Sequence, residues 1–241
     1  ALAAAMGERD AAVDSDESWL VVTDTVFSMD GDLAPLEDIC DVAAGEDEYV
    51  VVDEAHATGV VGDEGTGVVG EKGLTDEVDV QIGTLSKALG SQGGFVASSS
   101  EVVDLLVNEA RSFVYSTGLS PVDAAVSREA VEVSRGDEGD ERRSRLEENV
   151  ERLGDRLEGM GYDLICRESQ IIPVLIGGEK EALQVADVLD EEGVFAPAIR
   201  PPTVPEGTSR IRVSPMATHT EEEVEKTTDA FERAGEKAGV I

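Results

Sequence analysis

Three side chains that can act as acid, base and nucleophile follow two apolar runs of the chain. The first run, Tyr49–Val52, is followed by Asp53 and, three residues later, by His56. The second run leads into Gly83–Lys87, which reads Gly-Thr-Leu-Ser-Lys. Open α/β sheets bind ligands at the carboxyl ends of their strands. An acid, an imidazole and an amine at such ends favour chemistry between carbonyl and amine groups, with Lys87 as the nucleophile.

This set meets the needs of pyridoxal phosphate (PLP), which requires a lysine that forms a Schiff base and an acid that faces its pyridine nitrogen. The chain has only five lysines, and Lys87 stands in an apolar stretch bounded by glycines, where a solubilising lysine is least expected. Thr84 and Ser86 offer hydroxyl groups for a phosphate. Taken alone, Asp53 fits an N-cap or loop acid, and His56 fits a hydrogen-bonded loop histidine.

Other ligand motifs do not fit these segments. A P-loop has the order Gly-x-x-x-x-Gly-Lys-Ser/Thr, whereas here the serine precedes the lysine. The glycines of Gly59–Gly70 do not follow a strand as a dinucleotide fingerprint does, so we predict a loop there. Asp30–Asp32 is too short for an EF-hand loop, and His56 and His219 lack a close cluster of further ligands. We expect neither nucleotide hydrolysis nor a metal site.

Apolar runs alternate with amphipathic stretches in the first half of the chain, which predicts an α/β fold with a parallel sheet. The predicted strands are Trp19–Thr23, Tyr49–Val52, Val78–Leu85, Gly94–Ala97 and Phe113–Ser116. The predicted helices are Pro35–Ala44, Glu101–Arg111 and Pro121–Ser134. In this arrangement Asp53 and Lys87 both follow strand ends.

A domain boundary is predicted near Gly136–Asp140, where glycines and acids interrupt the helical pattern. The large domain would cover residues 1–138 and the small domain residues 139–241. A long charged helix, Glu141–Met160, is followed by two strands, a helix, two strands and a helix, which together form an α+β unit. These elements are Tyr162–Cys166, Ile171–Ile176, Glu179–Glu192, Val194–Ile199, Arg210–Val213 and Thr220–Ala238.

The chain is acidic along most of its length, with 53 Asp and Glu against 19 Lys and Arg and a formal net charge of −34. Because phosphate binding needs a basic patch, we expect no nucleic acid and no anionic membrane as partner. No signal peptide is visible, and Cys40 and Cys166 fit buried free thiols, so we expect a cytoplasmic protein. A dispersed acidic surface with few lysines suggests a cytoplasm of high salt, which screens the self-repulsion.

Four ordered motifs resemble the α-oxoamine synthase family, fold-type-I PLP enzymes that join an amino acid to an acyl-CoA with loss of CO2. They are Phe27–Leu36, Asp53–Gly59, Gly83–Gly90, and the C-terminal pair Ala198–Pro205 and Ser209–Val213. The C-terminal pair resembles the branch of the family that makes 8-amino-7-oxononanoate. The resemblance runs through essentially all 241 residues. It implies the aspartate-aminotransferase-like fold of class I/II aminotransferases: a partial large domain with a mostly parallel sheet and a C-terminal α+β domain.

The resemblance also implies how the cofactor is held. Lys87 would carry PLP as a Schiff base and, once released, act as a general base. Asp53 would face the pyridine nitrogen. His56, the third residue implied in catalysis, and Ser28 would contact the cofactor on the side of its phenolic oxygen.

Further residues are implied at the phosphate and at the substrate. Thr84, together with Ser86, would hold the phosphate, and Thr117 would reach it from the partner subunit. Arg212 would receive the carboxylate of the amino acid through two parallel hydrogen bonds, and Arg200 would lie near the substrate. Surface ion pairs, which are common in so acidic a protein, also explain both arginines.

The implied reaction condenses L-alanine with pimeloyl-CoA in biotin biosynthesis, in a homodimer with its active site at the interface. A second branch of the family, 2-amino-3-ketobutyrate CoA ligase, uses glycine and acetyl-CoA. A non-catalytic fragment or interaction module is an alternative of another class. The family has a segment ahead of the matching region, with a glycine-rich turn over the phosphate and a ring stacked on the cofactor. Because Ala1–Met6 resembles the middle or end of a helix, we expect a missing N-terminus and an inactive fragment.

Salt should stabilise the folded chain. With a formal net charge of −34, repulsion between carboxylates opposes compaction, and ions at molar concentration screen that repulsion. The free energy of unfolding, measured by urea titration, should rise from dilute buffer to molar KCl. Equal stability in both solutions would contradict adaptation to high salt.

Overall fold

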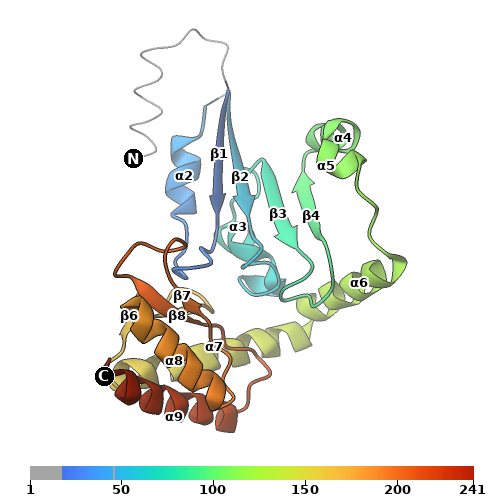
Figure 1. Ribbon diagram of the computed structural model, residues 1–241. Helices are drawn as coiled ribbons and strands as arrows, with labels where there is room; N and C mark the ends of the chain where they lie inside the picture. The colour runs from blue at the N-terminus through green and yellow to red at the C-terminus, as the bar shows by residue number, and fades with distance from the viewer. Residues whose placement is uncertain (1–17, 46) are drawn as a thin grey trace, which may run out of the picture. The chain divides into compact units, whose positions relative to one another are not determined.

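The computed structural model describes residues 18–45 and 47–241 (Figure 1). The helix expected at Ala1–Met6 lies outside these residues. Contacts between residues divide the chain into two compact units. Of the described residues, the first unit contains those up to Val26 and those from Ala34 to Asp140, and the second contains Phe27–Leu33 and Glu141–Ile241. Each unit has a four-stranded sheet of its own.

The sheet of the first unit has the order β1-β2-β3-β4 (Figure 1). Its strands are β1 (Trp19–Asp24), β2 (Glu48–Asp53), β3 (Val80–Thr84) and β4 (Gly94–Ser98). Strands β1, β2 and β3 run parallel, and β4 pairs with β3 antiparallel. Val50, Val51 and Val52 are buried, as expected for a central strand covered on both faces. The predicted α/β class with a mostly parallel sheet is confirmed.

The helices of the first unit agree with the sequence at three places and differ at two. The predicted helices correspond to α2 (Leu36–Val42), α4 (Ser100–Glu109) and α6 (Pro121–Arg135). The loop predicted at Gly59–Gly70 is wrong in part, because it contains a short 3-10 turn, η1 (Asp63–Gly65), and the start of α3 (Gly67–Lys72), whose first residues are buried. The strand predicted at Phe113–Ser116 is also wrong.

Helix α5 (Arg111–Val114) occupies that position. Phe113 and Val114 are exposed, whereas a buried strand would have paired on a sheet. The N–H of Val114 instead donates to the carbonyl of Ala110 at 2.9 Å, a local helical hydrogen bond. Apolar residues in a four-residue run do not distinguish a strand from one helical turn.

Helix α7 (Asp137–Gly159) begins directly after Gly136, so the interruption predicted at Gly136–Asp140 is limited to one residue. The carbonyl of Gly136 accepts the N–H of Gly139 at 2.9 Å, which starts the new helix. A side chain at Gly139 would collide with the carbonyl oxygen of Ser134. The change between the units falls within α7, after Asp140. The domain division at residue 138 stays a prediction.

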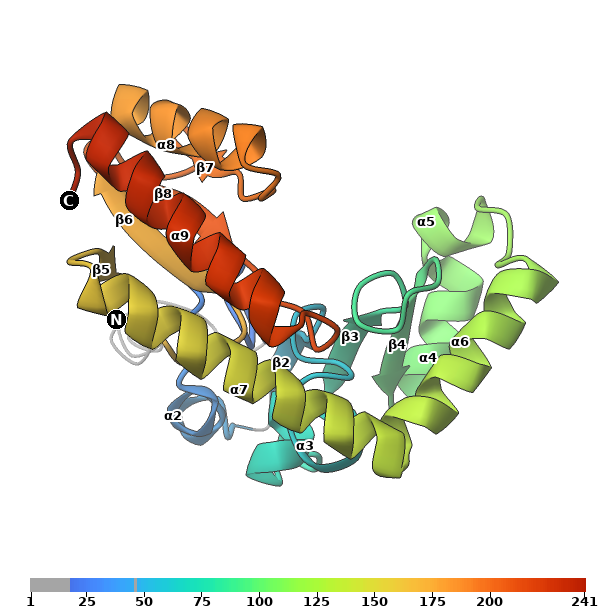
Figure 2. The same cartoon turned by 90° about the horizontal axis from the view of Figure 1, so that it is seen from below.

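The second unit has the predicted order of two strands, a helix, two strands and a helix. Its antiparallel sheet, in the order β5-β6-β8-β7, consists of β5 (Asp163–Leu164), β6 (Ile172–Gly177), β8 (Ser209–Val213) and β7 (Ala198–Ile199). Helices α8 (Glu179–Glu191) and α9 (Glu221–Ala238) run alongside each other (Figure 2). Thr220 and Glu223 form a capping box that starts α9, and left-handed Gly239 ends it.

The core of the second unit lies between its sheet and its helices. Leu157 of α7, Leu189 of α8 and Phe231 of α9 are fully buried in it. The ring of Tyr162 packs edge-on against Phe231, with 5.6 Å between the ring centroids. The Tyr162 hydroxyl donates to the carbonyl of Phe231 at 2.7 Å, and burial raises the pKa of Tyr162 to about 12.

Residues Phe27–Leu33, the docking segment, follow β1 in the chain but pack in the second unit. The Ser169 hydroxyl donates to the carbonyl of Gly31 at 2.6 Å, and the N–H of Leu33 donates to the Glu168 carboxylate at 3.0 Å. Gly31 has φ +70°, and a Cβ there would lie 2.5 Å from the carbonyl oxygen of Ile171. A single boundary along the sequence does not anticipate this packing.

The sequence predicts that the two cysteines are buried free thiols. Cys40 is buried as expected, whereas Cys166 is partly exposed, and both are free thiols. Within the described ranges, no helix combines the length and the apolar character that crossing a membrane requires.

Replacing Phe231 with alanine should lower the free energy of unfolding by about 3–5 kcal/mol, because a fully buried ring leaves a cavity. The chain offers a matched control: Phe195 is 88% exposed, and Phe195→Ala should change stability by less than about 0.5 kcal/mol. Urea denaturation of both variants measures the difference. Equal losses would contradict the placement of the core.

Candidate active site

Strand β2 ends at Asp53, and the register of the sheet determines its neighbours. Asp53 pairs with Asp24 of β1 on one side and with Ile82 of β3 on the other. Its Oδ1 accepts the N–H of Ala55 at 2.8 Å, at the start of the turn that carries His56. The same carboxylate has no other hydrogen-bond partner in residues 18–45 and 47–241, so Oδ2 remains available to a ligand.

The turn after β3 brings Lys87 to His56. The Nζ atom of Lys87 lies 2.9 Å from Nε2 of His56. A charged ammonium can only donate, so Nε2 accepts the hydrogen bond in that state. Left-handed Gly90 closes the turn, and its N–H donates to the carbonyl of Lys87 at 3.0 Å. The three residues that the sequence singles out for catalysis therefore lie at one edge of one sheet.

Two hydroxyl groups lie at the end of β3 and in the turn that follows it. The Oγ1 atom of Thr84 is 2.8 Å from the Oγ atom of Ser86, and either can donate. The Thr84 hydroxyl also donates to the carbonyl of Gly93 at 3.1 Å and accepts the N–H of Ser86 at 3.2 Å. Ser86 is exposed. The pair is thus fixed to the turn while one hydroxyl faces solvent.

Asp24, at the end of β1, is a further acid at this edge that sequence reasoning missed. Burial raises the pKa of the Asp24 carboxyl, the negative charge of Asp53 raises it further, and the positive charge of Lys87 lowers it. The signal was present in the sequence, because Asp24 also ends an apolar run, Trp19–Thr23. Asp24, Asp53 and Lys87 therefore form one electrostatic group.

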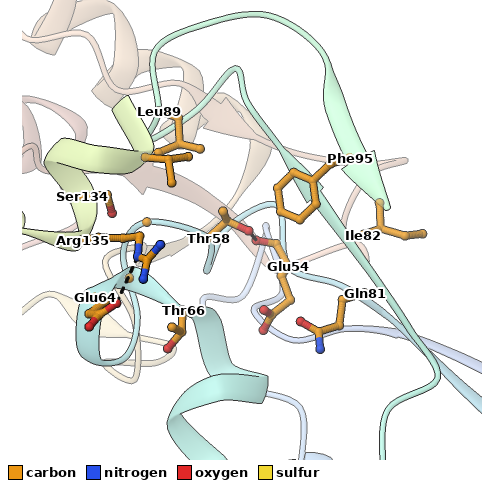
Figure 3. A pocket seen from close by; sticks show the side chains of 13 residues that line it. Glu54, Thr58, Glu64, Thr66, Gln81, Ile82, Leu89, Phe95, Ser134 and Arg135 are labelled. Atoms are coloured by element: carbon orange, nitrogen blue, oxygen red, sulfur yellow. Dashed lines mark hydrogen bonds and ion pairs between the residues drawn. The ribbon is translucent and has the colours of Figure 1, made fainter. Parts of the chain in front are cut away.

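Glu54 is a second missed residue and is only 3% exposed. Its carboxylate accepts the N–H of Val69 at 3.1 Å near the start of α3, and Gly67 approaches so closely that a Cβ would collide with it. Burial raises the pKa of the Glu54 carboxyl. Glu54 and Phe95 both line a cavity of about 220 Å³. Figure 3 shows how their side chains lie around it.

The remaining candidates are Thr117 and three residues of the second unit. Thr117 is exposed between α5 and α6. Nε of Arg212 donates to the backbone carbonyl of Ser28 at 2.6 Å, and burial lowers the pKa of Arg212. Arg200 is half exposed and lies 4.0 Å from the Glu179 carboxylate. The structure thus joins Ser28 to Arg212, and it joins Arg200 to a surface acid.

The donor set of the first unit fits the cofactor that the sequence implies. PLP needs an amine for its carbonyl carbon, an acid for its ring nitrogen and donors for its phosphate. Lys87 provides the amine, Asp53 provides a carboxylate oxygen without a hydrogen-bond partner in the described residues, and Thr84 and Ser86 provide hydroxyls. His56 adds a ring nitrogen next to the amine.

This fold and this donor set define the class of the protein. The family described as aminotransferase class I and II matches residues 4–231, and the chain belongs to it. A protein named 8-amino-7-oxononanoate synthase from Lysinibacillus sphaericus is 45% identical over 221 residues. The match covers 92% of this chain and 56% of the relative, so the chain spans little more than half the length of that curated protein.

Solved structures with a similar fold also include PLP enzymes. A serine palmitoyltransferase from Sphingomonas wittichii has a TM-score of 0.91 and 33% identity, and the match covers 97% of this chain and 59% of that one. A structure described as SPT with PLP internal aldimine has a TM-score of 0.92 and 31% identity, over 99% of this chain and 60% of that one. The resemblance to the α-oxoamine synthases is confirmed, as is PLP as the cofactor of this class of protein.

Glu54→Gln should change how stability depends on pH. The pKa of Glu54 is raised above its ordinary 4.5, so the folded state holds this proton longer than the unfolded state does. The free energy of unfolding therefore falls as the pH rises from about 4.5 through the folded pKa. Glutamine cannot ionise, so the variant should lack this component in urea titrations between pH 4 and 8.

Glu71→Gln is the matched control, because Glu71 is an exposed glutamate of α3, the helix that Glu54 contacts. It should reproduce the pH profile of the unsubstituted protein. Parallel profiles for Glu54→Gln and the unsubstituted protein would show that Glu54 does not hold its proton in the folded state.

Proposed function

We propose that the complete protein is a PLP-dependent acyltransferase that condenses L-alanine with pimeloyl-CoA to 8-amino-7-oxononanoate, a step of biotin biosynthesis. The observation that carries the proposal is the contact between Lys87 and His56. It lies at the edge of the sheet where strand β2 ends in Asp53. The name of the Lysinibacillus sphaericus relative, at 45% identity, supports the particular reaction.

In this proposal five residues of the first unit hold the cofactor. Lys87 binds its carbonyl carbon, Asp53 faces its ring nitrogen through Oδ2, and His56 contacts the side of the phenolic oxygen. Thr84 and Ser86, whose hydroxyls lie 2.8 Å apart at the end of β3 and in the turn before Lys87, would hold the phosphate. When bound, PLP supplies an electron sink for a carbanion at the Cα of the substrate.

Lys87 moves the proton in the proposed reaction. Its neutral amine, once released, acts as general base toward the Cα proton, and His56 at 2.9 Å orients it. The N–H of Ala55 donates to Oδ1 of Asp53 at 2.8 Å, so that Oδ2 can accept a hydrogen bond from the protonated ring nitrogen. The negative charge of Asp53 favours the protonated form of that ring.

The substrate carboxylate is assigned to Arg212. The Arg212 guanidinium is partly buried, and in the described part of the chain no carboxylate pairs with it, although the chain contains 53 acids. Two parallel hydrogen bonds from a guanidinium suit a carboxylate. Arg200, with its loose contact to Glu179, would lie near the substrate, and Ser28 near the cofactor.

The proposal extends to the assembly and its setting. A homodimer would let Thr117, which is exposed between α5 and α6, reach the phosphate of the neighbouring subunit. The acidic composition supports a cytoplasm of high salt. The similarity to a serine palmitoyltransferase makes L-serine a second candidate for the amino-acid substrate. Glycine is the candidate for the ligase branch.

The bond between the protein and its cofactor should depend on Lys87. The complete protein should be yellow, borohydride should bleach the band, and mass mapping should place the reduced cofactor on the peptide that contains Lys87. Lys87→Ala should abolish the band. Lys72→Ala, at an exposed lysine paired with Glu37, is the control and should keep it. A Lys87→Ala protein that keeps the band would rule out the assignment.

The substrates can be separated by following CoA release. The complete protein would be incubated with L-alanine, glycine or L-serine, each combined with pimeloyl-CoA, acetyl-CoA or palmitoyl-CoA. Fastest release with L-alanine and pimeloyl-CoA is expected. Preference for glycine with acetyl-CoA would assign the ligase branch. A yellow protein that releases CoA from none of the nine pairs would support a non-catalytic role.

A further inference from the structure

Two arginines share one face of strand β8. Side chains alternate along a strand, and Ile211 and Val213 face the core formed with α8 and α9. Arg210 and Arg212 therefore point to the opposite face of the sheet. Both contact the docking segment, Phe27–Leu33, within the second unit.

Arg210 is saturated by its surroundings. Only 4% of its side chain is exposed, and it forms an ion pair with the carboxylate of Asp30. Its Nε donates to the carbonyl of Thr208 at 3.0 Å and one Nη donates to the Thr208 hydroxyl at 3.2 Å. A buried guanidinium requires such partners, because removing either side of a buried pair leaves an uncompensated charge.

Arg212 is held at one end only. Its Nε donates to the carbonyl of Ser28, at 2.6 Å, and within residues 18–45 and 47–241 its two Nη atoms have no hydrogen-bond partner. The carbonyl of Ser28 thus fixes the plane of the guanidinium and leaves its outer side for a carboxylate. Asp30, two residues further along the segment, is the nearest acid in sequence to that anchor and is bound to Arg210.

We propose that the Arg210–Asp30 ion pair is a positioning device for Arg212. It fixes the docking segment so that Ser28 orients Arg212, and it keeps the Asp30 carboxylate from occupying the place of the amino-acid carboxylate. This inference rests on the proposed function of Arg212. It adds Arg210 and Asp30 as positioning residues that determine the affinity for the amino acid.

Replacing Arg210 and replacing Asp30 should affect amino-acid binding to different extents. Without Arg210, Asp30 is released on a segment tied to Arg212, and a tethered carboxylate competes at a high effective concentration. Arg210→Met should therefore weaken amino-acid binding strongly, and adding Asp30→Asn should restore part of the loss. Asparagine keeps an oxygen that can accept from Arg210, and Asp30 is 49% exposed, so Asp30→Asn alone should fold and should weaken binding less than Arg210→Met does.

The test compares two ligands of the complete, PLP-loaded protein by calorimetry: L-alanine, and ethylamine, which lacks the carboxylate. The unsubstituted protein should prefer L-alanine. Arg210→Met should lose at least about tenfold of that preference, the double variant should regain part of it, and the KM for acyl-CoA should stay unchanged. Arg233→Met removes the Arg233–Glu192 ion pair on the surface of the same unit. It should change neither the preference for L-alanine nor the KM for acyl-CoA.

The outcomes separate the inference from the proposed function. An unsubstituted protein that does not prefer L-alanine over ethylamine would refute the carboxylate role of Arg212 and the inference together. A clear preference that Asp30→Asn and Arg210→Met both leave intact would refute the inference alone. An equal loss of affinity for both ligands would show a merely structural role. Recovery of the preference for L-alanine in the Arg210→Met, Asp30→Asn double variant would not be expected if the ion pair had only a structural role.

Discussion

Strands β2 and β3 are locked in register by the hydrogen bond from the N–H of Glu54 to the carbonyl of Ile82 (2.7 Å), one step beyond Asp53. The turns after both strands therefore begin at the same edge of the sheet, and Lys87 meets His56 there. A slip of one residue would turn Asp53 to the other face of the sheet. The acid and the amine would then no longer share a site.

Much of this arrangement can be predicted from residues that are close together in the sequence. Val50–Val52 is apolar on both faces, which indicates a central strand, and the acid after it must then lie at the carboxyl end. The turn residues around Lys87 are equally local, since Gly90 supplies the left-handed conformation. For these reasons the sheet, and the grouping of Asp53 with Lys87, follow from patterns within a few residues.

The parts that could not be predicted depend on partners distant in sequence. Arg210 and Asp30 are 180 residues apart, and only the folded second unit shows that they meet. Helix α3 is stabilised by Glu54, fifteen residues ahead of Val69, so a glycine-rich stretch that looks like a loop forms a helix. Asp24 could not be predicted as a site residue, because one acid after one apolar run carries little information until the register places it beside Asp53.

In the proposed site, one sheet edge presents Lys87 and Asp53 to the same cofactor. A crystal structure of the complete protein with PLP would test this arrangement. Continuous density should join Nζ of Lys87 to the cofactor, and Oδ2 of Asp53 should lie about 2.7–3.0 Å from the ring nitrogen. Density that joins the cofactor to another lysine, or a ring nitrogen that faces a residue other than Asp53, would contradict the account.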